Sequence, residues 1–305
     1  MSAGGGVAGG GGEPVRIGLL HPGEMGASVG VAAAAVGAVV AWASEDRGEA
    51  TRRRAEAAGL ADVGTLDDLV DGAEAMFSVC PPHAAEAVAA AVAARGFTGV
   101  FVDMNAIAPA AARRIGEQVE RVGASFVDGG IIGPPVGTGA GTRLYLSGRD
   151  AKRAARLFAG SALEAVVVDE RPGSASAVKA CFATYTKGTS AMLLGIRALA
   201  RAEGVEAALL DQWERSSPGL AERSERGPTG SARKAWRWIG EMEQLAAAFR
   251  DAGLPDGFHL AAAEVYRRLE RFKHAGDGEP PAFDEVVRAT LGIPREPGQV
   301  RRGTL

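Results

Sequence analysis

The feature that most constrains the fold is an alternation of short apolar runs with Ala-rich helical segments between residues 15 and 170. The apolar runs are VRIGLL, AVVAWAS, AMFSVC, GVFVDM, ASFVDG, RLYLSG and AVVVDE. Strands that alternate with helices are joined by right-handed crossovers, which pair the strands in parallel and cover both faces of the sheet. Residues 15–171 are therefore predicted to form a doubly wound α/β domain.

The pattern changes after Gly173, where SASAVKACFATYTKGTSAMLLGIRALARAEG has helical character and almost no strand signal follows. This stretch predicts one long interdomain helix of about 30 residues, which needs apolar partners on several sides. Further helices are expected around AALLDQW, KAWRWIGEMEQLAAAFRDAG and HLAAAEVYRRLERFK. Residues 172–275 are thus predicted to be an all-α C-terminal domain.

Both ends of the chain are expected to be loose. Residues 1–14 (MSAGGGVAGGGGEP) are Gly-rich and carry little apolar surface to bury, so they are predicted to be a flexible tail. Residues 276–305, with the segments GEPP and IPREPGQVRRGTL, are predicted to be a loose C-terminal tail.

Charge and composition favour a small-molecule partner. The chain has 34 Lys and Arg against 37 Asp and Glu, so no strong field directs it to nucleic acid or to a membrane surface. The N-terminus lacks the basic and apolar regions of a signal peptide, and no apolar run is long enough to span a bilayer, which predicts a cytoplasmic protein. Cys80 and Cys181 are interpreted as buried and unpaired, and the four histidines lack the spacing of metal ligands, so no metal site is predicted.

A phosphate-binding turn is predicted where the first apolar run meets the first helix. Backbone N–H groups and the positive end of the helix dipole would face a pyrophosphate there, and glycines would let the backbone approach it. His21 replaces the first glycine of the usual G-x-G-x-x-G pattern, and the alternative is an ordinary strand-to-helix turn. The residues assigned to this cofactor site are His21, Pro22, Gly23, Glu24, Met25 and Gly26.

The end of the second apolar run favours NADP(H), although NAD(H) stays open. Ser44 stands at the strand end and Arg47 follows it, as a hydroxyl and a cation that suit a ribose 2′-phosphate. The intervening Glu45 and Asp46 would instead suit the 2′-hydroxyl of NAD. The arginines at 52–54 also fit a solvated helix face.

Four stretches resemble the 3-hydroxyacid dehydrogenase family, which includes 3-hydroxyisobutyrate, tartronate-semialdehyde and 6-phosphogluconate dehydrogenases. They are IGLLHPGEMG, VDMNAIAP, FVDGGIIGPP and GSASAVK, in the family's order and spacing. The resemblance implies a Rossmann domain followed by a helical substrate and dimerisation domain, a homodimer, and hydride transfer to or from a nicotinamide. It also implies that Lys179 is the catalytic acid and base, and it adds Cys80, Pro81 and Asn105 to the cofactor site.

Several residues depart from the family pattern at the expected substrate site. Ala183 replaces an Asn one turn after the lysine, Ile132 replaces a Ser, and Asn105 replaces another Ser; Asn105 is expected to bind cofactor or substrate, or to cap a turn. Lys187 is expected to grip the far end of an anionic substrate or to lie on the surface. Backbone N–H groups of Gly129, Gly130 and Gly133 are expected to hold an oxyanion.

Three functions compete. The first is an NADP(H)-dependent dehydrogenase or reductase that acts on a hydroxyl or carbonyl carbon, with Lys179 as acid and base. The second is an imine reductase, because enzymes that reduce C=N bonds are relatives of this family. The third is a non-catalytic dinucleotide-binding protein.

In the helical domain, aromatic residues at helical spacing either line the cleft or, more commonly, form core. These residues are Trp213, Trp236, Trp238 and Tyr266, with Glu241 beside them.

Overall fold

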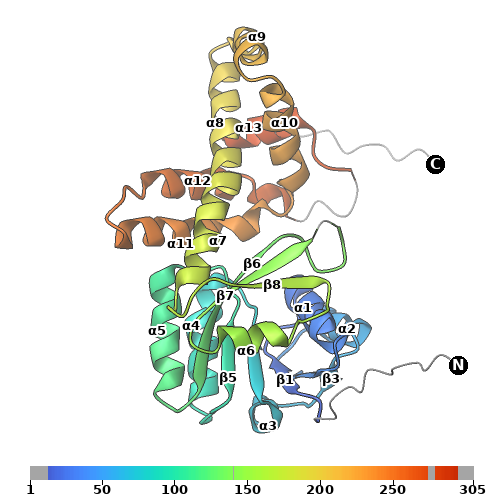
Figure 1. The fold of residues 1–305 in the computed structure, drawn as a ribbon. Helices are drawn as coiled ribbons and strands as arrows, with labels where there is room; N and C mark the ends of the chain where they lie inside the picture. Colours follow the sequence, from blue (N-terminus) through green and yellow to red (C-terminus); the bar gives the residue numbers. More distant parts are fainter. Residues whose placement is uncertain (1–12, 140, 274–278, 295–305) are drawn as a thin grey trace, which may run out of the picture. The chain divides into compact units, whose positions relative to one another are not determined.

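The computed structural model describes residues 13–139, 141–273 and 279–294 (Figure 1). The chain divides into two compact units, and each is described by itself. The first unit comprises the chain up to Asn105 together with Pro109–Ser176, and the second comprises Ala106–Ala108 and the chain from Ala177 onward. The expected tail at 1–14 falls, apart from its last two residues, outside the described residues.

The first unit is built on one eight-stranded sheet with the strand order β3-β2-β1-β4-β5-β6-β7-β8. All neighbouring strands are parallel except β6 and β7. This arrangement confirms the predicted doubly wound α/β class. The strands are β1 (Arg16–Leu19), β2 (Val39–Trp42), β3 (Ala61–Asp62), β4 (Ala75–Ser78), β5 (Val100–Asp103), β6 (Ser125–Ile132), β7 (Thr142–Ser147) and β8 (Leu163–Val167).

The central strands are covered on both faces, as their continuous apolar runs predicted. All four residues of β4 and of β5 are buried, and Leu19, Phe77 and Val102 are among the fully buried core residues. The helices of this unit are α1 (Glu24–Ala34), α2 (Glu49–Ala57), α3 (Leu66–Gly72), η1 (Pro82–Ala84), α4 (Ala85–Ala93), α5 (Pro109–Glu120) and α6 (Ala151–Arg156).

The sheet differs from the sequence prediction at β3 and at β6. β3 is a two-residue strand that no apolar run in the sequence predicted. β6 continues beyond the end of β5 and pairs antiparallel with β7, so that Gly130 lies opposite Tyr145. The chain reverses after β6 at Gly133, whose φ of +133° suits only glycine. The all-parallel sheet implied by alternation is therefore wrong at this one pair.

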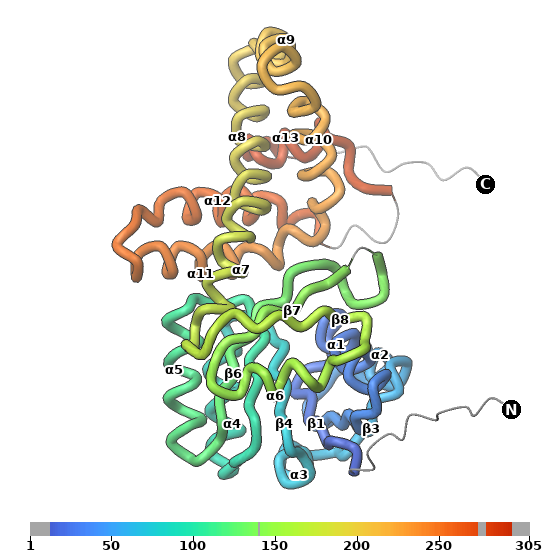
Figure 2. The backbone as a smooth tube through the Cα atoms, viewed as in Figure 1, coloured from blue at the N-terminus to red at the C-terminus, as the bar shows by residue number. Residues whose placement is uncertain are grey.

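The second unit contains the predicted long helical run, interrupted by a turn that was not predicted. α7 (Ser174–Ala183), which begins in the first unit, continues through a π-helical segment η2 (Thr184–Gly188) into α8 (Thr189–Ala202), as the tube in Figure 2 shows. The remaining helices are α9 (Glu206–Ser216), α10 (Leu220–Ser231), η3 (Ala235–Arg237), α11 (Trp238–Asp251), α12 (Gly257–Arg268), η4 (Glu270–Phe272) and α13 (Phe283–Thr290).

A buried arginine links several helices of the second unit. Arg197 on α8 is 4% exposed, donates to Glu206 at 2.9 Å and to Ser224 at 2.8 Å, and lies over the ring of Phe283. Because a buried guanidinium needs such partners to compensate its lost hydration, this cluster joins α8, α9, α10 and α13.

Two sequence expectations are wrong here. The loose tail expected at 276–305 contains α13, whose apolar residues Phe283, Val286 and Val287 follow helical spacing and pack into the helical core. The remaining parts of that tail, 276–278 and 295–305, lie outside the described residues. Cys181 is exposed rather than buried, and Cys80 is half-buried; both are free thiols. None of the helices in the described segments has the length and apolarity that crossing a membrane requires.

Candidate functional site

The turn between β1 and α1 has the geometry that close approach of a phosphate requires. The Gly23 N–H donates to the His21 carbonyl at 2.9 Å, and Gly23 is the N-cap of α1. A Cβ on Gly26 would lie 2.2 Å from the His21 carbonyl oxygen, whereas a Cβ on Gly23 would meet nothing within 4 Å. Gly26 therefore packs helix against strand, and Gly23 borders open space beside the N–H groups of the first helical turn. Glu24 is exposed.

Two buried polar atoms beside this turn lack partners among the described residues. They are Nδ1 of His21 and Nε of Arg47. Burial, and then the positive charge of Arg47, lower the pKa of His21 from 6.5 to about 4, so the imidazole is neutral at physiological pH. Unpartnered buried polar groups are costly unless a ligand or water satisfies them. The turn and these neighbouring atoms thus fit a polar, anionic ligand such as a dinucleotide.

Three arginines surround the loop after β2. Arg52 donates to the carbonyls of Ser44 at 2.7 Å and Arg47 at 3.1 Å, and Arg54 donates to the Pro22 carbonyl at 3.2 Å. Through α2, these bonds connect the loop that carries Ser44 and Arg47 to the turn between β1 and α1. The exposed carboxylates of Glu45, Asp46 and Asp62 lie beside Ser44 as well, and Ser44 hydrogen-bonds to Asp62, so the charges around Ser44 are mixed.

Asn105 fastens the ends of β4 and β5. Its amide donates to Ser78 Oγ at 2.9 Å and to Asp103 Oδ2 at 2.7 Å, and its oxygen accepts from the Cys80 N–H at 2.5 Å. Asn105 is 2% exposed. Both amide hydrogens are used within the unit, so this side chain positions the backbone at Cys80 and Pro81, which were assigned to the cofactor site. Burial, and then the charge of Asp103, raise the pKa of Cys80 to about 12, which keeps its thiol protonated.

A buried carboxylate, which sequence reasoning missed as a site residue, fixes the start of α7. Asp128 on β6 accepts from Ser147 Oγ at 3.0 Å, from the Ser176 N–H at 2.9 Å and from Ser176 Oγ at 2.5 Å. Burial raises the pKa of Asp128 and these bonds oppose the effect. The helix that carries Lys179 thus begins at a point fixed by several hydrogen bonds.

The Gly-rich residues assigned to substrate binding lie in or just after β6. Gly129 and Gly130 form ladder pairs with Leu146 and Tyr145 of β7. Ile132 is half-buried at the end of the strand, and Gly133 is exposed. The loop that follows is tied to α1, because the Val136 N–H donates to Ser28 Oγ at 3.0 Å. Gly129, Gly130 and Ile132 therefore belong to regular strand rather than to a loop.

In the second unit, the predicted residues lie along one helical run. Lys179 on α7 is half-buried. Ala183 is 4% exposed and packs in the helical core, so no polar group stands where the family Asn was expected. Lys187 in η2 forms an ion pair with Glu241, and its carbonyl accepts from the Tyr266 hydroxyl at 2.6 Å. Nothing in the sequence signals the Lys187–Glu241 pair, which joins residues 54 positions apart.

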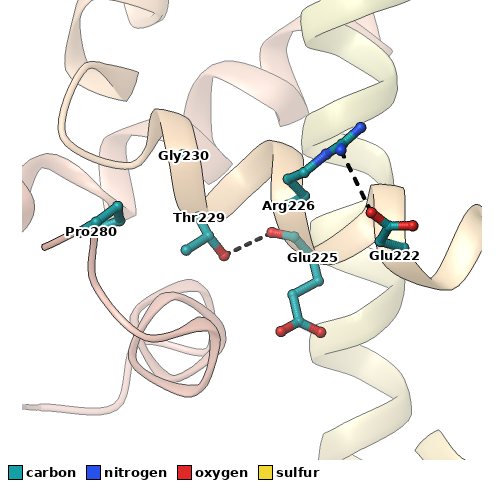
Figure 3. Close-up of a pocket in the computed structure, with 6 residues that line it drawn as sticks. All are labelled: Glu222, Glu225, Arg226, Thr229, Gly230 and Pro280. Carbon is teal, nitrogen blue, oxygen red and sulfur yellow. Dashed lines mark hydrogen bonds and ion pairs between the residues drawn. The ribbon is translucent and has the colours of Figure 1, made fainter.

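Figure 3 shows a pocket in the second unit, with a volume of about 580 Å³, whose lining includes none of these residues. Arg226 contacts Glu222 at 3.5 Å along α10, and most of the lining of the pocket is exposed. It is lined by Glu222, Glu225, Arg226, Thr229, Gly230 and Pro280. Over the described part of the chain, no cluster of three or more His, Cys, Asp or Glu side chains is arranged to hold a metal ion.

Comparison with known proteins agrees with this geometry. Residues 16–166 match the family described as the NAD binding domain of 6-phosphogluconate dehydrogenase, and residues 200–269 match a domain of unknown function (DUF1932). No curated protein matches the sequence.

Three solved structures illustrate the likeness. A conserved protein of unknown function, reported as structurally similar to 3-hydroxyacid dehydrogenases, is 26% identical, with 87% of this chain and 100% of that chain covered and a TM-score of 0.66. A 3-hydroxyisobutyrate dehydrogenase from Mycobacterium tuberculosis is 19% identical (90% and 98% covered, TM-score 0.68). An imine reductase from Bacillus cereus is 20% identical (90% and 98% covered, TM-score 0.53).

Proposed function

Because the chain belongs to the superfamily of 3-hydroxyacid dehydrogenases and 6-phosphogluconate dehydrogenase, we propose that it is an NADP(H)-dependent oxidoreductase acting on a hydroxyl or carbonyl carbon. The observation that carries the proposal is the phosphate-binding turn, with Gly23 beside open space and the unpartnered atoms of His21 and Arg47 next to it. A bound nicotinamide would supply or accept the hydride.

In this proposal, the backbone N–H groups at 23–26 hold the pyrophosphate. Ser44 and Arg47 hold the 2′-phosphate, with Arg52 fastening the loop that carries them. The neutral ring of His21 keeps Nδ1 available for a hydrogen bond to the cofactor and adds no charge of its own. Cys80 and Pro81, positioned by Asn105, complete the floor of the site.

Lys179 is proposed to donate a proton to the carbonyl oxygen during reduction and to take it back during oxidation. An ammonium offers three donors that polarise a carbonyl. Asp128 contributes by fixing the first turn of the same helix. We include Gly129, Gly130, Ile132, Gly133 and Ala183 in the proposed substrate site, where Ile132 and Ala183 favour an apolar part of the substrate.

The first test is isothermal titration of NADPH and NADH into the wild-type chain and two variants, Arg47→Gln and the matched control Arg53→Gln. Arg53 lies on the exposed face of α2 and pairs with Glu49 at 3.8 Å. We expect NADPH to bind at least about tenfold more tightly than NADH, since a charge-assisted hydrogen bond contributes about 1.5–3 kcal/mol. Arg47→Gln should reduce this difference in affinity between NADPH and NADH, and Arg53→Gln should leave the difference unchanged. Absence of binding by either dinucleotide refutes the oxidoreductase function.

The second test replaces Lys179 with Ala and measures turnover on carbonyl and cyclic imine panels. The proposal expects loss of carbonyl reduction with the NADPH dissociation constant unchanged. The competing imine reductase, which the apolar Ile132 and Ala183 also suit, predicts imine reduction that survives the substitution. Cofactor binding without turnover on either panel would identify a non-catalytic dinucleotide-binding protein.

We further propose that the protein is a homodimer that packs through α8. Met192, Ile196 and Leu199 follow i, i+4, i+7 spacing, and Met192 and Leu199 are 53% and 62% exposed. Light scattering should give twice the chain mass for the wild type and a smaller value for Leu199→Glu. Leu254→Glu, at an exposed apolar residue after α11, is the matched control and should stay dimeric. A monomeric wild type contradicts the proposal.

A further inference from the structure

We infer that Lys187 and Glu241 form a recognition site for a neutral hydrogen-bonding group of the substrate, a hydroxyl or a carboxamide. The site lies on the helix face that carries Lys179. The inference rests on the proposed function, because it concerns the substrate of that same reaction.

Lys187 is held by residues of α11 at its ammonium and by a residue of α12 at its backbone carbonyl. Its ammonium is ion-paired with Glu241 and lies 5.3 Å from the ring centroid of Trp238. Its carbonyl accepts the hydroxyl of Tyr266, whose pKa burial raises, so that the phenol stays protonated and donates. The side chains of Lys187 and Glu241 are 26% and 9% exposed. A flexible lysine is thus held in one place while part of its side chain remains exposed.

The π-helical segment brings Lys187 into line with Lys179. Eight residues of regular α-helix would turn Lys187 about 80° away from Lys179 and carry it about 12 Å along the axis. A π turn accommodates one extra residue, which removes about 100° of that rotation. By this geometry the two lysines would lie within about 20° of each other around the axis, with the buried Ala183 between them along it. A substrate that reaches Lys179 and extends past the small side chain of Ala183 would meet the Lys187–Glu241 pair.

Stability alone does not explain the pair. A buried ion pair loses about as much hydration energy as it gains in attraction, and apolar side chains of equal volume would hold the helices as well. A π turn inside a long helix is likewise uncommon, and such turns concentrate at functional sites. The cluster therefore has the character of a binding site rather than of core.

The charges of the pair select the ligand group. The ammonium keeps donors and the carboxylate keeps acceptors after they bind each other, so donor and acceptor stand side by side. A hydroxyl or a carboxamide satisfies both at once. A carboxylate on the substrate would be repelled by the negative charge of Glu241, and an ammonium on the substrate would be repelled by the positive charge of Lys187. The site thus selects against a substrate with an anionic far end. Such a substrate was expected from Lys187 when Glu241 was not considered as its partner.

The test uses methyl ketones of five to eight carbons that end in a methyl, hydroxyl, carboxamide or carboxylate group. Each is titrated calorimetrically into the complex of the full chain with NADP⁺, which cannot reduce a ketone, so binding is measured without turnover. We expect a hydroxyl- or carboxamide-ended ketone to bind at least about tenfold more tightly than the methyl- and carboxylate-ended ones, which corresponds to about 1.4 kcal/mol.

Glu241→Gln provides the decisive comparison, because it removes the negative charge at nearly constant shape. The carboxylate-ended ketone should then bind more tightly and the hydroxyl-ended ketone more weakly, opposite changes that impaired folding cannot produce. Glu243→Gln is the matched control on the same helix, since Glu243 is exposed and pairs with Arg267. Lys187→Met should weaken binding of both ketones.

The outcomes separate the two proposals. If NADP⁺ does not bind, the proposed function fails and the inference fails with it. If NADP⁺ binds but no polar-ended ketone is preferred at any chain length, or if Glu241→Gln changes both ketones in the same direction, the inference alone is overturned.

Discussion

The buried imidazole of His21 makes folding stability depend on pH in a predictable direction. In the folded chain, burial and the charge of Arg47 lower the pKa of His21 from 6.5 to about 4. The unfolded chain therefore binds a proton between pH 6.5 and about 4 that the folded chain does not bind, and stability falls as the pH falls through that window. Above pH 6.5 the imidazole is neutral in both states and this contribution is constant.

Linkage gives the size of the effect. Between pH 7.5 and pH 5.0, the lowered pKa of a fully buried His21 would reduce the free energy of unfolding by about 2 kcal/mol. Because the ring of His21 is only partly buried, solvent screening reduces the expected loss to about 1–2 kcal/mol. His21→Asn removes the titrating group and keeps a polar side chain of similar size, so it should abolish this part of the pH dependence.

The assay is urea-induced unfolding of the wild type and His21→Asn at pH 7.5 and 5.0. The decrease in unfolding free energy between the two pH values should be about 1–2 kcal/mol smaller in His21→Asn. His83→Asn, at an exposed histidine of η1, is the matched control and should retain the wild-type decrease. Equal decreases in the wild type and His21→Asn would show that His21 is not held neutral, and the electrostatic description of the turn would be wrong.

Three further predictions concern stability, each measured by urea unfolding. Gly26→Ala should lower the unfolding free energy by more than about 2 kcal/mol because its Cβ meets a backbone oxygen, whereas Gly23→Ala should change it by less than about 1 kcal/mol; equal effects would contradict the turn geometry. Arg197→Met should lower the unfolding free energy by about 3 kcal/mol, because it leaves the buried partners of Arg197 uncompensated. Arg215→Met, which breaks an exposed ion pair, should lower the unfolding free energy by less than about 1 kcal/mol. Asp128→Ala should cost about 3 kcal/mol or more, and Asp128→Asn clearly less, since burial already disfavours the charged carboxylate; the reverse order would refute the assigned network.

The fold could be predicted well because its signals are local. Alternation of apolar runs with helical segments identified seven of the strands, and the absence of strand signal after Gly173 identified the helical second part. The prediction failed where local signal was weak or misleading. β3 is too short for a period, α13 follows a Gly- and Pro-rich stretch, and β6 reverses into β7 although the surrounding pattern indicated crossovers.

The residues of the candidate site were predictable in part. His21, Gly23 and Gly26 stand out because a strand, a turn and a helix follow each other directly in the sequence. Their roles stay proposals, as do those of Lys179 and Lys187. Asn105 was expected to bind cofactor or substrate, or to cap a turn, but its hydrogen bonds to Ser78 and Cys80 could not be predicted, because another strand end supplies these partners.

The sequence by itself therefore determined the order and type of most elements, the position of the glycine turn between β1 and α1, and the superfamily, since each depends on neighbours along the chain. Only the tertiary structure decided which polar side chains pair. Asp128 meets Ser176 across 48 positions, and Lys187 meets Glu241 across 54, at a π turn that helical periodicity does not reveal. The physical reason is that such partners come together only when distant elements pack, so the charge at a site is set by residues that local patterns do not connect.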